Sequence, residues 1–197
     1  MKFLSALLVS TALLTASAQA EPKEFSFDAA HTNIIWGVSH AGFSNFVGEF
    51  RDFDGKVMLD EQNPTKSSVK VTIKTGSARS DSDHLDEKLK TDFFNTAKFP
   101  DATFESTKVT KTGEKTAKME GNLTLLGVTK PVTLDVTLNK IGLDKWQNKH
   151  KAGFHATTTI KRSDFGMNYL VPDVGDDVTI TIDTEIMRER EKTDVEE

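Results

Sequence analysis

The feature that most constrains the fold is an alternation of apolar and polar residues with a period of two. It runs through residues 69–74, 132–139 and 178–186, where Val, Ile or Leu alternates with polar side chains. This period gives a β-strand one apolar face and one polar face. Less regular candidate strands cover residues 34–38, 47–59, 102–110, 116–126 and 152–161. The pattern predicts about eight strands, paired antiparallel because parallel sheets bury both faces.

The connections between these segments agree with an antiparallel sheet. Short sequences with Gly or Pro occur at residues 61–64, 111–114 and 127–131, and we expect each to be a turn or short link between two strands. Strands with one buried face leave two main architectures, a two-sheet sandwich or a closed barrel. The strand pattern alone leaves both open, although several strands are long enough to favour a deep barrel.

One segment, residues 80–94, breaks the alternation. It opens with Ser and Asp residues suited to N-capping, and Leu85, Leu89 and Phe93 recur at helical spacing. We therefore predict one substantial helix there.

The first residues have the features of a cleavable signal peptide. Lys2 precedes an apolar run over residues 3–14, and Ala18-Gln19-Ala20 supplies the small residues that a signal peptidase reads. The run is shorter than the roughly 20 apolar residues that cross a bilayer. We expect cleavage before Glu21 and no lipid anchor, because no Cys follows the cleavage point.

The rest of the chain suits a single domain. We predict a signal peptide at residues 1–20, one β-barrel domain at residues 21–188 and a charged, disordered tail at residues 189–197. The chain has no Cys, which excludes disulfides, thiol chemistry and thiolate metal sites. Its formal net charge of −5 gives no electrostatic reason to bind nucleic acid, so we expect no nucleic-acid partner.

The five His residues form no recognisable catalytic or metal motif. His31 and His40 are nine residues apart, an odd separation that puts them on opposite faces of an unbroken strand. There is no H-x-x-x-H, no G-x-S-x-G and no phosphate-binding glycine loop. We therefore predict no catalytic residues, no metal site and no cofactor.

Aromatic residues are concentrated in one half of the chain. Most of the 13 Phe residues lie between positions 43 and 104. In a sandwich these side chains would form a core, whereas in a barrel some of them would line a cavity that binds ligands by burying apolar area. Both interpretations stay open at this point.

Four segments together resemble the YceI-like family, the lipocalin-like polyisoprenoid-binding proteins. They are Asp28-Ala29-Ala30-His31-Thr32 through Trp36 to His40, with Gly48-Glu49-Phe50 and Phe53-Asp54-Gly55; Asp86 through Leu89 to Phe94, with Phe99-Pro100 and Thr103-Phe104-Glu105-Ser106; Gly121 to Val132; and Arg162-Ser163-Asp164-Phe165-Gly166. The resemblance implies an all-β fold, an eight-stranded antiparallel lipocalin-like barrel with one helix near the barrel opening. It also implies a periplasmic protein that holds a long isoprenoid or similar amphiphile for transport, storage or sequestration.

Inward-facing side chains of such a barrel would contact the ligand. The predicted lumen residues are Trp36, Val38, Phe93, Phe94, Phe104, Leu123, Leu125, Leu134, Val136, Phe154 and Ile180. Phe93 and Phe94, after the helix, could form a lid. His40 and Arg162 are candidates for the polar head group. Each also has a structural interpretation: a hydrogen-bonded histidine near the mouth, and an ion pair of Arg162 with a carboxylate such as Asp164.

Two other functions stay open beside ligand binding. An enzyme acting on a lipophilic substrate would need a titratable pair inside the lumen, such as His40 beside an inward carboxylate. A ligand-free structural or stress-response protein would have a filled core. We favour a binding protein without catalytic activity that does not span the membrane, and a homodimer is a further alternative.

Overall fold

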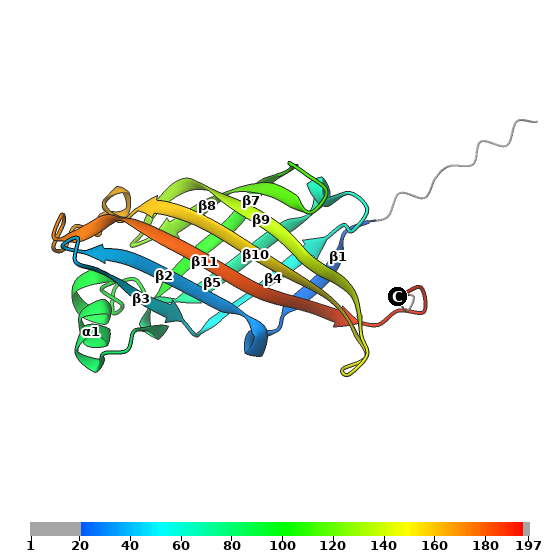
Figure 1. Ribbon diagram of the computed structural model, residues 1–197, viewed down its shortest axis with the longest axis horizontal. Coiled ribbons are helices and arrows are strands. Elements are labelled where there is room, and N and C mark those ends of the chain that lie inside the picture. Colours follow the sequence, from blue (N-terminus) through cyan, green and yellow to red (C-terminus); the bar gives the residue numbers. More distant parts are fainter. Residues whose placement is uncertain (1–20, 195–197) are drawn as a thin grey trace, which may run out of the picture.

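The strands form one sheet that closes on itself. The computed structural model describes residues 21–194. Strand β1 pairs with both β4 and β11, which closes the ring β1-β4-β5-β7-β8-β9-β10-β11, all pairs antiparallel (Figure 1). The ring strands are β1 (Lys23–Phe27), β4 (Phe53–Leu59), β5 (Ser68–Lys74), β7 (Asp101–Lys111), β8 (Thr116–Leu125), β9 (Val128–Asp144), β10 (Lys149–Lys161) and β11 (Val174–Glu189). This is the predicted eight-stranded antiparallel barrel.

Three further strands pair with the ring or with one another. Strand β2 (Asn33–His40) follows β1 after a 3-10 turn, and both pair with β11. Strand β3 (Ser44–Phe50) pairs with β2, and the two-residue β6 (Ala78–Arg79) pairs with β3. The single strand predicted over residues 47–59 is therefore wrong, because residues 51 and 52 interrupt it between β3 and β4.

Two ends of the barrel can be distinguished by their connections. One end carries the turn at residues 41–43, helix α1 (Asp83–Lys88) and the link at residues 162–173; we call it the α1 end. The other end carries the loops at residues 60–67, 112–115 and 145–148; we call it the Phe25 end. In Figure 1 the α1 end is at the left and the C-terminus is at the right.

Helix α1 is fixed by short hydrogen bonds around its first turn. The Ser82 hydroxyl accepts from the backbone N–H of Leu85 at 3.4 Å, which satisfies one of the free amides of a helix start. Ser80 donates to Asp86 Oδ1 from its backbone N–H at 2.7 Å and from its hydroxyl at 2.8 Å. A π-helical turn, Leu89–Phe93, continues α1. The predicted helix is confirmed, although it begins at Asp83 and not at residue 80.

The link between β8 and β9 is shorter than predicted. The turn consists of Leu126 and Gly127, with φ values of 51° and 76°, and β9 already begins at Val128. The prediction of a link over residues 127–131 is therefore wrong. Pro131 lies inside β9 and pairs with Asn122, beyond the stretch of β9 that pairs with β10. A proline is tolerated there because no second neighbour needs its missing N–H.

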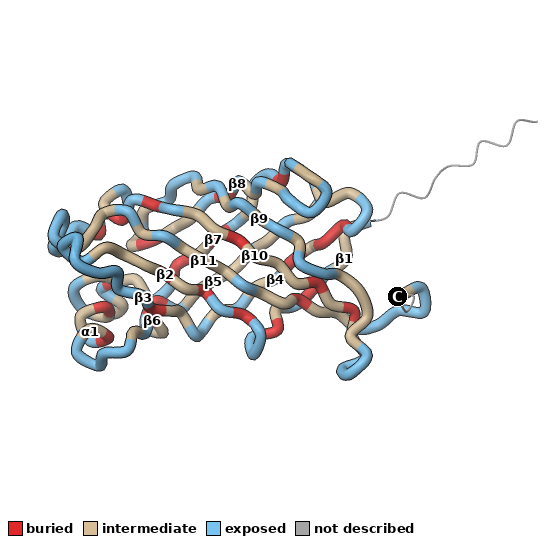
Figure 2. The backbone as a smooth tube through the Cα atoms, in the orientation of Figure 1, coloured by how far each residue is buried: buried red, intermediate tan, exposed pale blue. Residues whose placement is uncertain are grey.

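The apolar side chains inside the barrel form two buried clusters, one toward each end. The cluster at the α1 end is Trp36, Ala78, Leu89, Phe94, Ala102, Leu125, Ile160, Phe165 and Met167. The cluster at the Phe25 end is Phe25, Val57, Leu59, Ala152 and Ile186. In Figure 2 buried residues appear as short stretches along the strands, separated by half-buried and exposed ones. The core is therefore divided and does not fill the barrel as one block.

The chain beyond β11 turns back onto the barrel. The Arg188 guanidinium donates to both carboxylate oxygens of Asp194, at 2.6 and 2.8 Å. Burial would raise the pKa of Asp194, but first the Arg188 hydrogen bond and then the backbone N–H of Glu191 hold it well below its ordinary value. The expected disordered tail at residues 189–197 thus differs from the structure up to residue 194, and residues 195–197 lie outside the described range, as does the predicted signal peptide.

Candidate ligand cavity

A cavity of about 540 Å³ lies inside the barrel. Its walls come from alternate residues of the ring strands, as the period of two requires, together with α1 and the turns at its mouth. The volume falls in the range of known ligand sites, roughly 300–1,000 Å³. Many wall residues, among them Leu134, Val136 and Phe154, are only half-buried although they point inward, because they border this space.

All of the residues predicted to face the lumen do border the cavity. They are Trp36, Val38, Phe93, Phe94, Phe104, Leu123, Leu125, Leu134, Val136, Phe154 and Ile180, together with His40 and Arg162. Parity along the strands accounts for the residues on strands, whereas Phe93 and Phe94 follow helix α1 and Arg162 follows β10. Their contacts with a ligand stay a prediction.

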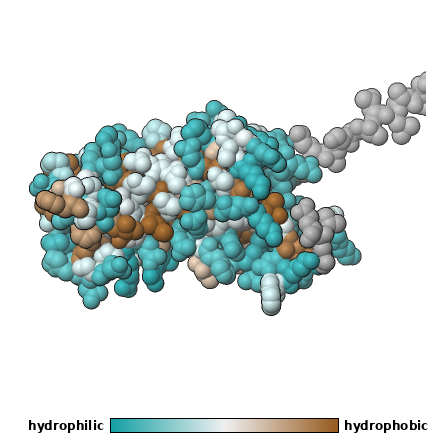
Figure 3. Space-filling view, in the orientation of Figure 1, coloured by the Kyte–Doolittle hydropathy of each residue, from teal (hydrophilic) through white to brown (hydrophobic). Residues whose placement is uncertain are grey.

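The cavity opens at the α1 end. The lining residues that are exposed, within residues 21–194, are His40, Phe46, Ser82, His84 and Leu170, and all of them belong to that end. Apolar surface reaches the left tip of the molecule in the orientation of Figure 1 (Figure 3). At the Phe25 end the lining residues Val57, Leu59 and Ile186 are buried in one cluster with Phe25, which is 1 % exposed.

Two glycines leave room for aromatic rings in the wall, a feature that strand periodicity does not reveal. A Cβ on Gly48 would lie 2.2 Å from Cζ2 of Trp36, and a Cβ on Gly121 would lie 2.3 Å from Cζ of Phe104. Gly48 pairs with Trp36 itself, and Gly121 lies on β8 beside β7, the strand that carries Phe104. In both cases the aromatic ring lies over the glycine on the neighbouring strand. The two glycines therefore set the shape of the lumen through the rings that they admit.

The π-helical turn brings two phenylalanines to the mouth. Phe94 packs edge-on against Phe50, with 5.5 Å between ring centroids. Phe93 packs edge-on against Tyr169 at 5.1 Å, and the Arg162 guanidinium lies 5.7 Å from its centroid. Phe94 thus connects the α1 segment to β3, and Phe93 connects it to the 162–173 link. A lid over the mouth would need contacts at these places.

Arg162 organises that link from inside. It is 2 % exposed, and its guanidinium donates four hydrogen bonds to backbone carbonyls at 2.7–2.9 Å. The accepting carbonyls belong to Met167, Tyr169, Val174 and Gly175. Burial lowers the pKa of Arg162, and the charge of Asp176 opposes this. The predicted ion pair with Asp164 is wrong, because the guanidinium donates to backbone carbonyls of the link and of the start of β11.

The polar side chains of the lining are distributed unevenly. Toward the Phe25 end, Thr32 and Thr184 are hydrogen-bonded to each other at 2.8 Å, and the Ser67 hydroxyl accepts from Asp60 N–H at 3.0 Å. No Asp or Glu lines the cavity among the described residues. The titratable pair that an enzymatic mechanism would need is therefore not formed by His40 and a carboxylate within that range.

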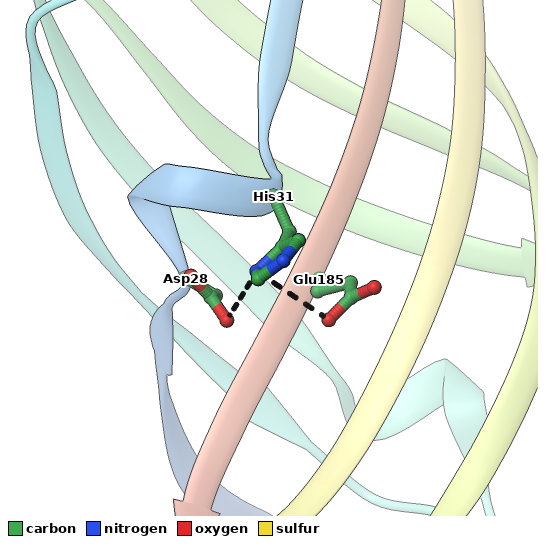
Figure 4. Close-up of side chains that lie close together, drawn as sticks. All are labelled: Asp28, His31 and Glu185. Atoms are coloured by element: carbon green, nitrogen blue, oxygen red, sulfur yellow. Dashed lines mark hydrogen bonds and ion pairs between the residues drawn. The ribbon is translucent and has the colours of Figure 1, made fainter. Parts of the chain in front are cut away.

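A separate cluster of titratable groups lies where β1 passes into β2. His31 Nδ1 is 2.9 Å from Asp28 Oδ2 and 4.0 Å from Glu185 Oε2 (Figure 4). Lys151 Nζ lies 3.1 Å from Asp28 and 3.0 Å from Glu185, so an ammonium group already balances these carboxylates. Burial would raise the pKa of Asp28, but hydrogen bonds from His31 and Lys151 lower it. None of these four residues borders the cavity, and we interpret the cluster as structural.

The fold and the cavity define a class: small closed β-barrels whose hollow interior is apolar and open at one end. The YceI-like domain model matches residues 25–186, so the chain belongs to the YceI-like family. A UPF0312 protein of Pseudomonas putida is 43% identical over 169 residues, covering 84% of this chain and 87% of that protein.

Solved structures agree with this assignment. A YCEI protein of Campylobacter jejuni is 28% identical with a TM-score of 0.71, covering 93% of this chain and 100% of that one. A polyisoprenoid binding domain from Saccharophagus degradans shares the fold with a TM-score of 0.66 at 13% identity, covering 83% and 97%. Within the described residues, no helix is long and apolar enough to cross a membrane.

Proposed function

We propose that this protein binds a long isoprenoid or similar amphiphilic lipid inside the barrel, in order to carry, store or sequester it. The observation that supports the proposal most directly is the hollow apolar lumen of about 540 Å³, open at one end. A filled core, which a ligand-free structural protein would have, is not what residues 21–194 form.

The size of the cavity gives the argument its energetic basis. Cavities left by core truncations cost about 24 cal/mol per Å³, and on that scale a dry space of ≈ 540 Å³ would cost roughly 13 kcal/mol. This is as large as the whole stability of an ordinary domain, about 5–15 kcal/mol. Water is a poor occupant, because an apolar wall offers it few hydrogen bonds. A hydrocarbon chain can pack against an apolar wall and needs no hydrogen bonds.

The comparison with known proteins supports the same class of ligand. The Saccharophagus degradans domain, which has the same fold, is named for binding polyisoprenoids. An enzymatic role is the weaker alternative, since the described lining holds no carboxylate to work with His40. We therefore assign no catalytic residue.

Extraction of the purified protein tests the proposal. Protein from its native source is extracted with organic solvent, and the extract is analysed by mass spectrometry; we expect a long-chain amphiphile in stoichiometric amount. Val136→Trp should lower the yield at least tenfold, because Val136 borders the cavity and the larger ring would occupy space that the hydrocarbon chain needs.

The matched control for that variant is Thr137→Trp on the same strand. Thr137 is exposed and points away from the lumen, so its replacement should leave the yield unchanged. Extracts that are repeatedly empty, or equal yields from the two variants, would contradict the proposal.

We further propose that the protein works in the periplasm after export. The support is the signal-peptide pattern of residues 1–20, which lie outside the described range. Fractionation of cells should recover the protein with periplasmic markers, and its N-terminal sequence should start at Glu21. A cytoplasmic protein that starts at Met1 would refute export.

A further inference from the structure

The basic side chains that border the cavity share one location. They are His40, His84, Lys88 and Arg162, and all lie at the α1 end, whereas no Asp or Glu borders the cavity among the described residues. The formal charges of this lining at pH 7, those of Lys88 and Arg162, are therefore both positive and both at the mouth. The two ends of a bound amphiphile would therefore meet different environments.

Helix α1 contributes two of these groups from a single face. His84 and Lys88 are four residues apart, which places them on one side of the helix, and both border the cavity. Within residues 21–194 the imidazoles of His84 and His40 make no side-chain hydrogen bond or ion pair, and the His40 ring packs edge-on against Phe46. Their ring nitrogens are free to meet a ligand.

The carboxylates of the same helix, Asp83, Asp86 and Glu87, do not border the cavity. Asp86 accepts hydrogen bonds from Ser80, and Glu87 accepts from Lys90 at 2.8 Å. Asp92 lies 3.4 Å from Lys88 Nζ, which leaves other N–H groups of that ammonium for a further partner. The hydrogen bond to Asp92, with the charge of that carboxylate, raises the pKa of Lys88, so Lys88 stays cationic.

We propose that the cavity selects amphiphiles with an acidic oxygen head group and binds them in one orientation, the head beside His84 and Lys88 and the hydrocarbon tail toward the Phe25 end. A carboxylate or phosphate monoester would gain charge-assisted hydrogen bonds at the mouth. A cationic head would be repelled by Lys88 and would find no carboxylate in the described lining. The buried charge of Arg162 adds to the same field without needing contact, since its hydrogen bonds go to backbone carbonyls.

This inference rests on the proposed function, and binding of three matched probes separates the two. The probes share one sixteen-carbon chain and differ in the head: hexadecanoate, hexadecanol and hexadecyltrimethylammonium, each below its micellar concentration. The protein has two Trp residues, Trp36 in the cavity wall and Trp146 outside it. The variant Trp146→Phe therefore leaves Trp36 as the only indole whose fluorescence reports binding. We expect the acid to bind at least tenfold more tightly than the cation, with the alcohol between them.

Variants of α1 locate the selectivity. The double variant His84→Gln/Lys88→Gln should weaken hexadecanoate binding about tenfold, the low end for charged hydrogen bonds at a partly exposed site, and change hexadecanol binding less than twofold. The control is Lys90→Gln, which removes a charge from the continuation of the same helix without touching the cavity lining and should change neither affinity. The unchanged alcohol affinity also shows that the double variant is folded.

Photo-crosslinking measures the orientation of the bound amphiphile in the cavity. Two hexadecanoate probes carry a diazirine, one beside the carboxylate and one at the chain end, and labelled peptides are mapped by mass spectrometry. The first should label residues 82–93 and the second the Phe25 end, including β1 and β4. Equal affinities for acid and cation, or the reverse labelling, would overturn the inference while leaving lipid binding intact. Failure of all three probes to bind would instead count against the proposed function.

Discussion

The two ends of the barrel solve different problems with different chemistry. At the Phe25 end, large apolar side chains are sealed under charges: Phe25 is 1 % exposed, and the Arg188 guanidinium lies 5.4 Å from its ring. At the α1 end, the exposed apolar side chains Phe46 and Leu170 border an opening, and so do the basic groups. The first end is built for stability and the second for access. The contrast shows that one closed sheet can enclose a packed core at one end and an open cavity at the other.

The largest effect should come from opening the sealed end. We expect Phe25→Ala to destabilise the protein by about 4 kcal/mol, because it removes a fully buried ring and leaves a cavity that a rigid barrel cannot collapse. Urea unfolding followed by circular dichroism measures the change. A loss below 1 kcal/mol would mean that this end is not the stabilising one.

The next effect concerns the order of the open end. Arg162→Leu should cost about 3 kcal/mol, because four carbonyls at 2.7–2.9 Å lose their charged donor. The damage should be local: hydrogen exchange of residues 163–174 should become faster, while amides of β1 and β4 keep their protection. Uniformly faster exchange would show that the two ends are not separable.

The strands, the helix and many of the residues that border the cavity could be predicted from the sequence, largely from periodicity. Parity along a strand fixes the face of each side chain, so Leu134 and Val136 were placed in the lumen without knowing their neighbours. The helix followed from its caps and its spacing of Leu85 and Leu89. The barrel itself rested on the resemblance to the YceI-like family, because alternation alone is equally consistent with a sandwich.

The rest depends on which strands meet and in what register, which periodicity does not contain. Lys151 reaches Asp28 and Glu185 only because β10, β11 and the β1–β2 junction lie side by side. The hydrogen bonds of Arg162 depend on the path of an irregular link. Gly48 and Gly121 were noticed only as parts of motifs, and their role appears once the rings across them are known.

Gly121 offers a smaller perturbation, in the wall between the two ends. Gly121→Ala should cost about 2 kcal/mol, because the new Cβ would lie 2.3 Å from Phe104 and 2.8 Å from the Glu105 carbonyl. Gly153→Ala is the matched control, since its Cβ would meet nothing closer than 3.9 Å. Thermal unfolding of both variants measures the difference. Equal melting temperatures would show that the ring of Phe104 is free to move aside.

The ion cluster near the Phe25 end predicts a dependence of stability on pH. The pKa of Asp28 is lowered in the folded protein from about 3.9 in the unfolded chain. Its contribution is therefore fully present above about pH 5 and is lost as pH falls below 4 toward the folded pKa. We expect Asp28→Asn to cost about 1.5 kcal/mol at pH 7 and much less at pH 3. Urea unfolding at the two pH values, with the exposed Asp177→Asn as control, tests whether the gap narrows.

The smallest effect is expected from the exposed aromatic residues, one at each end. Phe43 is 91% exposed at the turn beside the opening, and Trp146 is 98% exposed in the loop at the Phe25 end. Phe43→Ser and Trp146→Ser should each change the free energy of unfolding by less than about 0.5 kcal/mol, because neither side chain loses packing. Phe43 does not border the cavity, so hexadecanoate affinity should also stay within twofold. A stability loss above 1 kcal/mol for Phe43→Ser alone would mean that the β2–β3 turn folds over the mouth in solution, and the open end would then be a closed one that a ligand has to displace.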